Sequence, residues 1–282
     1  MDANLLAELL PAQFQGQLTP LAGGLTNHSW RLDTPQQSYW LRMGNTHSES
    51  LGINRGQELV AHQAAVDADL APLIHYAKPE LGILLLDWLP ESDWQSFVGE
   101  SHQDCAPNLT LLMGKVAQLH QLTPALNALS LNEQAEHYLR QLSSLSAEHQ
   151  HYARCFEQAR LNLNYTPVFC HHDLNAANVL GARPWLIDWE YAAFGDAAFE
   201  LAVIADSFKL SEQGARQLLA DYNAAGGEVS YARFQARRPW VQWLTVLWAA
   251  LQYQYTGQSD YRLLQEQATR QLAHDLADFQ AR

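Results

Sequence analysis

Apolar and polar residues follow two different patterns along the chain. Between residues 19 and 93, short apolar runs alternate with turns rich in Gly, Pro and Asp, which predicts strands. From residue 108 onwards, apolar residues recur at intervals of three and four, which predicts helices with one apolar face. The change of period predicts an α+β fold with two lobes, a small β-rich N-terminal lobe (residues 1–90) and a larger, mostly helical C-terminal lobe (residues 91–282).

The first lobe is expected to contain five strands and two helices. An apolar segment predicts an opening helix over residues 4–14. The stretch 19–43 predicts three strands, joined by a Gly-containing loop and by a turn at Asp33-Thr34-Pro35. A helix is expected over residues 54–66, and residues 72–93 predict a strand pair that ends in a dense apolar run.

The second lobe is expected to be helical except at one place. A stripe of apolar residues predicts a helix over residues 108–124, which Pro124 ends. Further helices are expected from Glu133 to Asn162 and from about Ala197 to the end of the chain. Between them, the apolar runs around residues 166–169 and 185–188 predict two short buried strands.

Composition narrows the choice of partners. The chain has 282 residues, 48% of them hydrophobic, which suffices for a folded core, and a net charge of −13 argues against nucleic acid or an anionic membrane as the main partner. Its three cysteines have unrelated spacings, which indicates neither disulfides nor a cysteine zinc site. No basic leader is present, and no window reaches the about 18 apolar residues of a membrane span. We therefore expect a cytoplasmic protein without a membrane partner, and find no sequence signal for its oligomeric state.

One segment, FCHHDLNAANVLGARPWLIDWEYAAFGD (residues 169–196), combines polar groups with short apolar runs. Asp173 and Asn178 lie in the turn after the first run, and Asp188 ends the second. Phosphoryl transfer needs a carboxylate that accepts the proton of the attacking hydroxyl, and oxygen ligands for magnesium. Singly, these residues are also common turn formers and caps, but together and in this order they indicate a kinase site. A zinc site at His171 and His172 is not favoured, because neighbours on a strand face opposite ways.

The segments HHDLNAANVL and LIDWEYA resemble the catalytic segments of the aminoglycoside phosphotransferase superfamily, which shares the protein-kinase-like fold. The second segment is most similar to the choline, ethanolamine and thiamine kinase branch. The resemblance implies that Asp173 is the catalytic base, that Asn178 and Asp188 bind Mg²⁺, that His171 supports the loop, and that ATP is the donor.

The first lobe is expected to bind the nucleotide. Glycine lets the backbone approach phosphate oxygens closely, so the loop that contains Gly23, Gly24, Thr26 and Asn27 is a candidate, although an ordinary hairpin loop has the same composition. No lysine lies on the third expected strand, where a protein kinase has one.

Arg42 takes the place of that lysine, and the resemblance implies the same for the choline kinase branch. Arginine binds phosphate through two N–H groups, and Glu58 is the expected carboxylate that holds Arg42. A surface ion pair is the alternative interpretation of the two residues. The run ILLLDWLPE resembles the hinge that carries adenine, with backbone groups of Asp87, Trp88 and Leu89 facing the base, although Trp88 can also be a core residue.

Aromatic residues dominate the last third of the chain. Trp240 and Trp243 share one helix face with Leu247 and are expected in the core. Trp248 lies off that face, where its ring could attract an organic cation. The segment LWAALQ is similar to a choline kinase stretch with a tryptophan against the trimethylammonium group, but those enzymes usually carry another tryptophan where this chain has Thr245.

Carboxylates are the other candidates for contact with a cationic acceptor. Glu190 is the preferred countercharge, with a bridge to a backbone amide as the alternative. Asp196 and Glu200 are further candidates, and for Asp196 a helix N-cap is preferred.

Four functions remain to be compared. The first is an ATP- and Mg²⁺-dependent kinase that acts on the hydroxyl of a small, cationic metabolite such as choline, ethanolamine or thiamine. The second is a kinase of the same fold for aminoglycosides or sugars, and the third a non-catalytic nucleotide-binding protein. A protein kinase is least favoured, since Trp189 and Glu190 follow Asp188 in place of a Phe-Gly pair.

Overall fold

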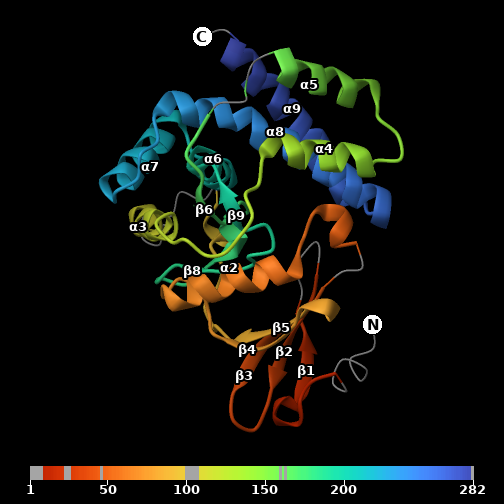
Figure 1. Cartoon of the computed structure of the whole chain (residues 1–282), viewed down its shortest axis with the longest axis vertical. Coiled ribbons are helices and arrows are strands. Elements are labelled where there is room, and N and C mark those ends of the chain that lie inside the picture. Colours follow the sequence, from red (N-terminus) through yellow and green to blue (C-terminus); the bar gives the residue numbers. More distant parts are fainter. Residues whose placement is uncertain are drawn as a thin grey trace.

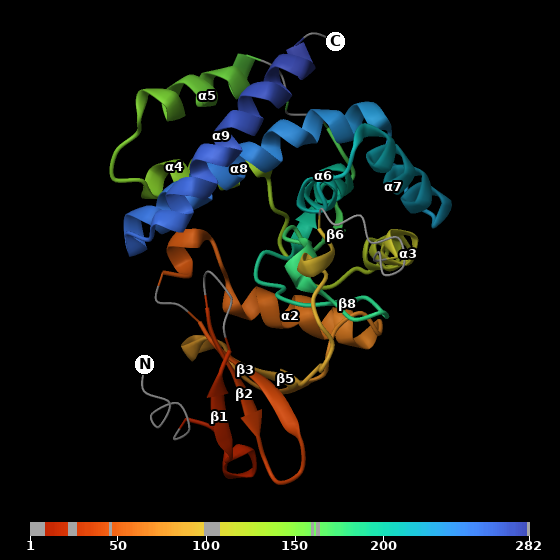
Figure 2. The ribbon, with the colours of Figure 1, turned by 180° about the vertical axis from the view of Figure 1, so that it is seen from behind.

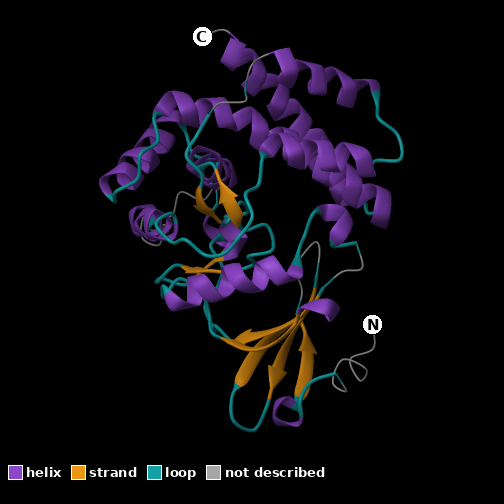
Figure 3. Cartoon of the chain, viewed as in Figure 1, coloured by secondary structure: helices purple, strands orange, loops and turns teal. Residues whose placement is uncertain are grey.

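The computed structural model describes residues 9–21, 27–44, 47–98, 108–158, 161 and 164–280. A twisted β-sheet forms one end of the molecule and a group of helices the other (Figures 1 and 3), as expected for an α+β fold with two lobes. Among these residues, no helix combines the length and the apolar character that crossing a bilayer requires.

The sheet has five antiparallel strands in the order β1-β2-β3-β5-β4, which confirms the strands predicted from the apolar runs. Alternate side chains of β2 and β3 pack with Phe14 and Ile83 in a small core on one face of the sheet. The expected helix over residues 4–14 lies partly outside the described residues, and its last part is a single 3₁₀ turn (η1, Ala12–Phe14). The strands are β1 (Gln17–Pro20), β2 (His28–Asp33), β3 (Ser38–Met43), β4 (Ile74–Lys78) and β5 (Ile83–Asp87).

Helix α2 (Arg55–Asp67) lies between the sheet and the helical end, as both views show (Figures 1 and 2). It begins at Asn54, whose side chain accepts hydrogen bonds from two backbone amides of the first turn. Ala61 and Ala65 on its buried face belong to the core of the helical end, not to the core of the sheet. The apolar core is therefore not divided at residue 90, and the lobe boundary there stays a prediction.

The helical end is built around α8 and α9, which pack against each other; α6 and α4 pack against α8. Trp240 and Trp243 are buried in this core, as predicted. Helix α3 ends at Leu119, ahead of Pro124, where the prediction had placed its end. The helical segments expected from Glu133 to Asn162 are two helices separated by a serine-rich turn. The helices are α3 (Leu109–Leu119), α4 (Leu131–Gln141), α5 (Ala147–Gln158), α6 (Ala197–Ser207), α7 (Glu212–Ala224), α8 (Tyr231–Thr256) and α9 (Ser259–Gln280).

Two small two-stranded sheets carry the segment 169–196. Strand β6 (Val168–Cys170) pairs with β9 (Ala193–Gly195), and β7 (Val179–Leu180) pairs with β8 (Trp185–Leu186). The two predicted strands thus form and do not pair with each other. The loop after β6 and the end of β8 are brought together by this arrangement.

The stability of this fold should depend on the protonation of His62 on α2. Its Nε2–H donates to the carbonyl of Pro72 at 2.8 Å, and burial lowers the pKa of His62 from 6.5 to about 4 in the neighbourhood of Glu58, Arg42 and His171. Between these two pH values the unfolded chain binds a proton that the folded chain does not, so the free energy of unfolding falls as the pH falls, by up to roughly 3 kcal/mol.

Urea unfolding from pH 7 to pH 4.5 tests this expectation on the wild type and on His62→Gln, which cannot take up the proton. The variant should lose less stability over this range than the wild type. Equal losses in the two proteins would contradict it.

Candidate active site

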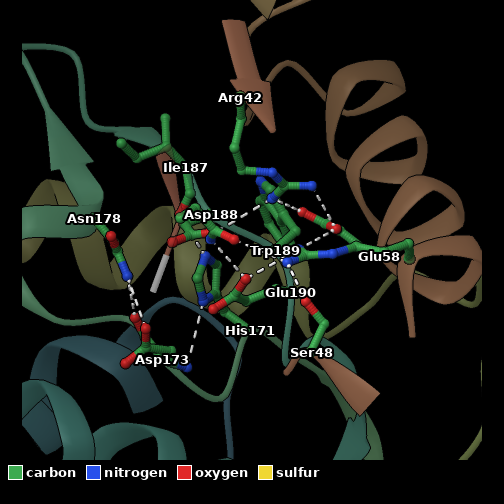
Figure 4. Close-up of polar contacts among 12 residues, drawn as sticks. Arg42, Ser48, Glu58, His171, Asp173, Asn178, Ile187, Asp188, Trp189 and Glu190 are labelled. Carbon is green, nitrogen blue, oxygen red and sulfur yellow. Dashed lines mark hydrogen bonds and ion pairs between the residues drawn. The ribbon is translucent and has the colours of Figure 1, made fainter. Parts of the chain in front are cut away.

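Asp173 lies in the loop after β6, where two asparagine side chains orient its carboxylate. Asn178 donates through Nδ2 to Asp173 Oδ2 at 3.0 Å, and Asn175 donates to Oδ1 at 3.1 Å. Asn175 also caps the 3₁₀ turn η5 (Ala176–Asn178), which carries Asn178. The five-residue spacing of Asp173 and Asn178 is thus the spacing at which one turn returns the chain to the carboxylate (Figure 4).

Asp188 follows β8 and is fixed to the same loop through its neighbour Ile187. The Ile187 amide donates to the Asn178 carbonyl at 3.1 Å, and His171 Nε2 donates to the Ile187 carbonyl at 2.8 Å. His171 Nδ1 in turn accepts from the Asp173 amide at 3.3 Å. His171 therefore joins the two predicted segments (Figure 4), a geometry that agrees with the supporting role expected of it.

Arg42 on β3 reaches Asp188 from the sheet. Its guanidinium binds both oxygens of Glu58 on α2, with Nη2 at 2.8 Å from Oε2, and its Nη1 lies 3.7 Å from Asp188 Oδ1. The side chains of Arg42 and Glu58 are each 3% exposed, so the alternative of a surface ion pair is wrong. Residues from both lobes thus meet at one place (Figure 4).

Burial raises the pKa of both aspartates. The pKa of Asp173 rises to about 7, with the nearby charge of Glu190 adding to the effect and the two asparagines opposing it. The pKa of Asp188 also rises, because burial and Glu190 together outweigh Arg42. Two carboxylates are therefore held close together in a poorly solvated place, which favours a cation between them.

The donor atoms at this place fit a magnesium ion. Asp188 Oδ1 is buried and has no hydrogen-bond partner among the described residues. Asn178 uses its amide nitrogen on Asp173, which leaves its amide oxygen as a second hard donor. One carboxylate and one amide oxygen are a common protein contribution to a Mg²⁺ site that phosphates and water complete.

Glu200 on α6 binds the backbone at the start of the loop after β6. Both of its carboxylate oxygens accept from the His171 amide, and Oε2 also accepts from His120 Nε2 at 2.9 Å. Burial opposes the ionisation of Glu200, but the hydrogen bond and charge of His120 outweigh it and lower the pKa to about 2. Glu200 is fully buried and is not available as a substrate countercharge.

Asp196 is also an internal residue. It caps α6, as preferred from the sequence, and it forms ion pairs with Arg233 and Arg237 at 2.6 Å each. Only 1% of Asp196 is exposed, so it too is excluded as a contact for a substrate.

Trp248 belongs to a group of aromatic side chains beside Glu190. Its Nε1 donates to the hydroxyl of Tyr191 at 3.0 Å, and its ring lies edge-on to Tyr261 at a centroid distance of 5.6 Å. Trp248 is half-buried, whereas Trp240 and Trp243 are enclosed. Tyr191 was not predicted as a neighbour of Trp248.

Arg55 is the functional candidate that the sequence interpretation missed. Its guanidinium binds Glu58 and Glu190 through Nη1, at 2.9 and 3.0 Å, and Asn27 through Nη2 at 2.9 Å. Asn27 Nδ2 donates to Glu190 Oε2 at 2.9 Å. The only local signal was the i, i+3 spacing of Arg55 and Glu58 on a helix. Such pairs are common on helices, so the spacing does not distinguish a functional residue.

Only some of the other predicted nucleotide contacts lie within the described residues. Gly23, Gly24 and Thr26 lie outside the described residues. Asp87 accepts from His75 Nε2 at 2.6 Å, and the ring of Trp88 lies 5.0 Å from the guanidinium carbon of Arg31. With Leu89 these residues are half-buried at the end of β5, and their role as a hinge stays a prediction.

Comparison with known proteins identifies the family of this chain. The model of the phosphotransferase enzyme family matches residues 17–240. Protein LicA of Haemophilus influenzae is 28% identical over 212 residues, which are 71% of this chain and 61% of that protein. Thiamine kinase of Escherichia coli O81 is 33% identical over 107 residues, which are 36% of this chain and 38% of that protein.

Solved structures share the fold over nearly the whole length. The crystal structure of choline kinase LicA from Streptococcus pneumoniae superposes with a TM-score of 0.80 at 19% identity, covering 98% of this chain and 97% of that one. A structure of LicA in complex with AMP gives a TM-score of 0.78 at 18% identity, covering 96% and 98%.

The buried Arg42–Glu58 pair should be costly to break. Glu58→Ala removes the carboxylate that Arg42 and Arg55 share and leaves buried Arg42 with only its longer contact to Asp188, which is expected to lower the free energy of unfolding by about 3 to 5 kcal/mol. Glu136→Ala, which breaks the exposed pair with Arg140 on α4, should cost no more than about 1 kcal/mol. Chemical denaturation of both variants measures the difference, and similar losses would show that burial of the first pair has no energetic consequence.

Proposed function

Since the chain belongs to the phosphotransferase enzyme family, we propose that it transfers a phosphoryl group from ATP to the hydroxyl of a small, cationic metabolite. The observation that carries the proposal is the meeting of Asp173, Asn178 and Asp188 from the C-terminal lobe with Arg42 from the sheet. This set supplies a base, metal ligands and a cation, which are the parts that phosphoryl transfer requires.

Asp173 is the proposed general base. Asn175 and Asn178 each donate to one of its oxygens, which fixes the plane of the carboxylate. Its pKa of about 7, raised by burial, lies close to neutral pH, where a carboxylate is both deprotonated in part and basic enough to accept a proton. Asp173 would accept the proton of the acceptor hydroxyl as the hydroxyl oxygen attacks the γ-phosphorus of ATP, the bond from that phosphorus to the bridging oxygen breaks, and ADP leaves.

Asn178 and Asp188 are the residues that would hold Mg²⁺. When bound, the ion would neutralise part of the negative charge of the phosphates. Arg42 brings a permanent positive charge to within 3.7 Å of Asp188 and is kept in place by Glu58, so it is suited to bind phosphate oxygens beside the metal ligands.

A cationic acceptor is supported by the aromatic group beside the base. Trp248 and Tyr191 are joined by a hydrogen bond, and Tyr191 lies three residues after Asp188. Aromatic faces attract organic cations by about 0.5 to 2 kcal/mol or more. The names of the relatives, a choline kinase and a thiamine kinase, belong to enzymes whose substrates combine a hydroxyl with a positively charged nitrogen.

Replacement of the base tests the reaction. Asp173→Asn keeps the size of the side chain but cannot accept the proton, so turnover is expected to fall by about 10² to 10⁴-fold. Binding of a non-hydrolysable ATP analogue should remain, because Asp173 is not a proposed phosphate contact. Asp188→Asn should instead weaken Mg²⁺-dependent binding of the same analogue, measured by calorimetry. Undiminished turnover of Asp173→Asn would exclude the assigned role.

The acceptor is identified by ADP release in the presence of choline, ethanolamine, thiamine and an aminoglycoside. We expect turnover with a cationic alcohol, and we expect Trp248→Ala to raise its KM by roughly tenfold, corresponding to about 1.4 kcal/mol of lost attraction. Trp248→Phe keeps an aromatic face and should recover part of the affinity. Turnover with the aminoglycoside alone would favour an antibiotic-type kinase.

A further inference from the structure

Five charged side chains form a row of alternating sign between the sheet and the loop after β8. The order is Glu190, Arg55, Glu58, Arg42 and Asp188, and each neighbouring pair lies within ion-pair distance. The two ends of the row come from the C-terminal lobe and are separated by one residue, the fully buried Trp189. The three middle members come from the N-terminal lobe. The row therefore begins and ends on one short segment that carries a proposed metal ligand.

We infer that Arg55 and Glu190 act as a clasp between the lobes that positions Asp188 against Arg42, and that Glu190 does not contact the acceptor. In this inference both residues are positioning residues. It builds on the proposed function, but the contacts that support it stand in the structure without any ligand.

Glu190 is nearly buried, and its Oε2 is bound by two side chains of the N-terminal lobe. Its Oε2 accepts from Arg55 at 3.0 Å and from Asn27 at 2.9 Å, and the side chain is 3% exposed. Asn27 Oδ1 accepts from Arg55 Nη2, which closes a ring of three side chains. A carboxylate with a guanidinium partner has little net charge left to attract an organic cation.

The sheet has a place built for the Arg55 guanidinium. Gly44 follows β3, and its amide donates to the carbonyl of Gly82 at 2.9 Å. A Cβ on Gly44 would lie 3.2 Å from both Nε and Nη2 of Arg55, so the guanidinium rests against bare backbone. A Cβ on Gly82 would lie 2.8 Å from Gly44 atoms, so the two glycines allow this close approach together.

Ser48 completes the fixation of Arg55 from the loop before α2, since its hydroxyl accepts from Nη2 at 3.0 Å. The guanidinium thus contacts the polar side chains of Asn27, Ser48, Glu58 and Glu190. A lysine could satisfy only some of them, because an ammonium is a point charge without the planar set of donors. Arginine is therefore required at this position for more than its charge.

A double-mutant cycle tests the clasp with Arg55→Ala, Glu190→Gln and the combined variant. Two quantities are measured: the Kd of the Mg²⁺-bound, non-hydrolysable ATP analogue by calorimetry, and the KM of the best acceptor. Each single variant should weaken nucleotide binding by about tenfold, and the combined variant by no more than either single one. The acceptor KM should change by less than about twofold, because the clasp does not face the acceptor.

Three further variants separate positioning from a loss of folding. Arg140→Ala removes an exposed arginine of α4 and should leave Kd unchanged. Arg55→Lys should give an intermediate Kd. Gly44→Ala keeps all charges but places a methyl group against the guanidinium, so it should weaken nucleotide binding by less than Arg55→Ala does. If Arg55→Ala does not fold, as judged by circular dichroism, these last two variants carry the test.

Two results would overturn the inference. One is a rise of about tenfold in the acceptor KM of Glu190→Gln with an unchanged nucleotide Kd, which would make Glu190 an acceptor contact. The other is additivity of the two single variants in Kd, which would show that Arg55 and Glu190 act independently. If the wild type turns over no acceptor, the proposed function fails, whereas the binding cycle still reports on the clasp.

Discussion

The buried ion pair of Arg42 and Glu58 is the interaction on which the rest of the site depends. Two charges in a place that excludes water are stable only when their partners and geometry are good. Both oxygens of Glu58 are used by Arg42, and Oε2 is shared with Arg55. Glu58 thereby fixes two guanidiniums at once, and both point from the N-terminal lobe towards carboxylates of the other lobe. Loss of Glu58 would leave two cations without a common anchor.

Helix α2 is the element that gives this pair its position. Its apolar residues Ala61 and Ala65 pack into the helical end, while Arg55 and Glu58 in its first turn face the sheet and the cleft. The helix is therefore joined to the helical end by apolar contacts and by the Arg55–Glu190 ion pair, and to the sheet by the Glu58–Arg42 ion pair. Since these two kinds of contact lie on the same helix, a shift of α2 would change the position of Arg42 relative to Asp188.

The carboxylates of the segment 169–200 divide into those that hold the loop and those that are left for chemistry. Glu200 and Asp196 are enclosed and bind the His171 amide and two arginines, respectively. Asp173 and Asp188 keep partly exposed side chains, and burial raises the pKa of each. Of these four carboxylates, Asp173 and Asp188 are therefore the ones left with exposed surface.

The sequence by itself determined the order of strands and helices and the group Asp173, Asn178 and Asp188, because apolar periodicity and the spacing of a turn are properties of short segments. It also indicated the pair of Arg42, on a predicted strand, and Glu58, on the helix that follows that strand. Only the tertiary structure decided that α2 shares the core of the helical end, that Glu200 and Asp196 are internal, and that Arg55 meets Glu190. The contact of Arg55 with Glu190 joins residues 135 positions apart. No local sequence pattern specifies which distant charged residues will meet when the chain packs.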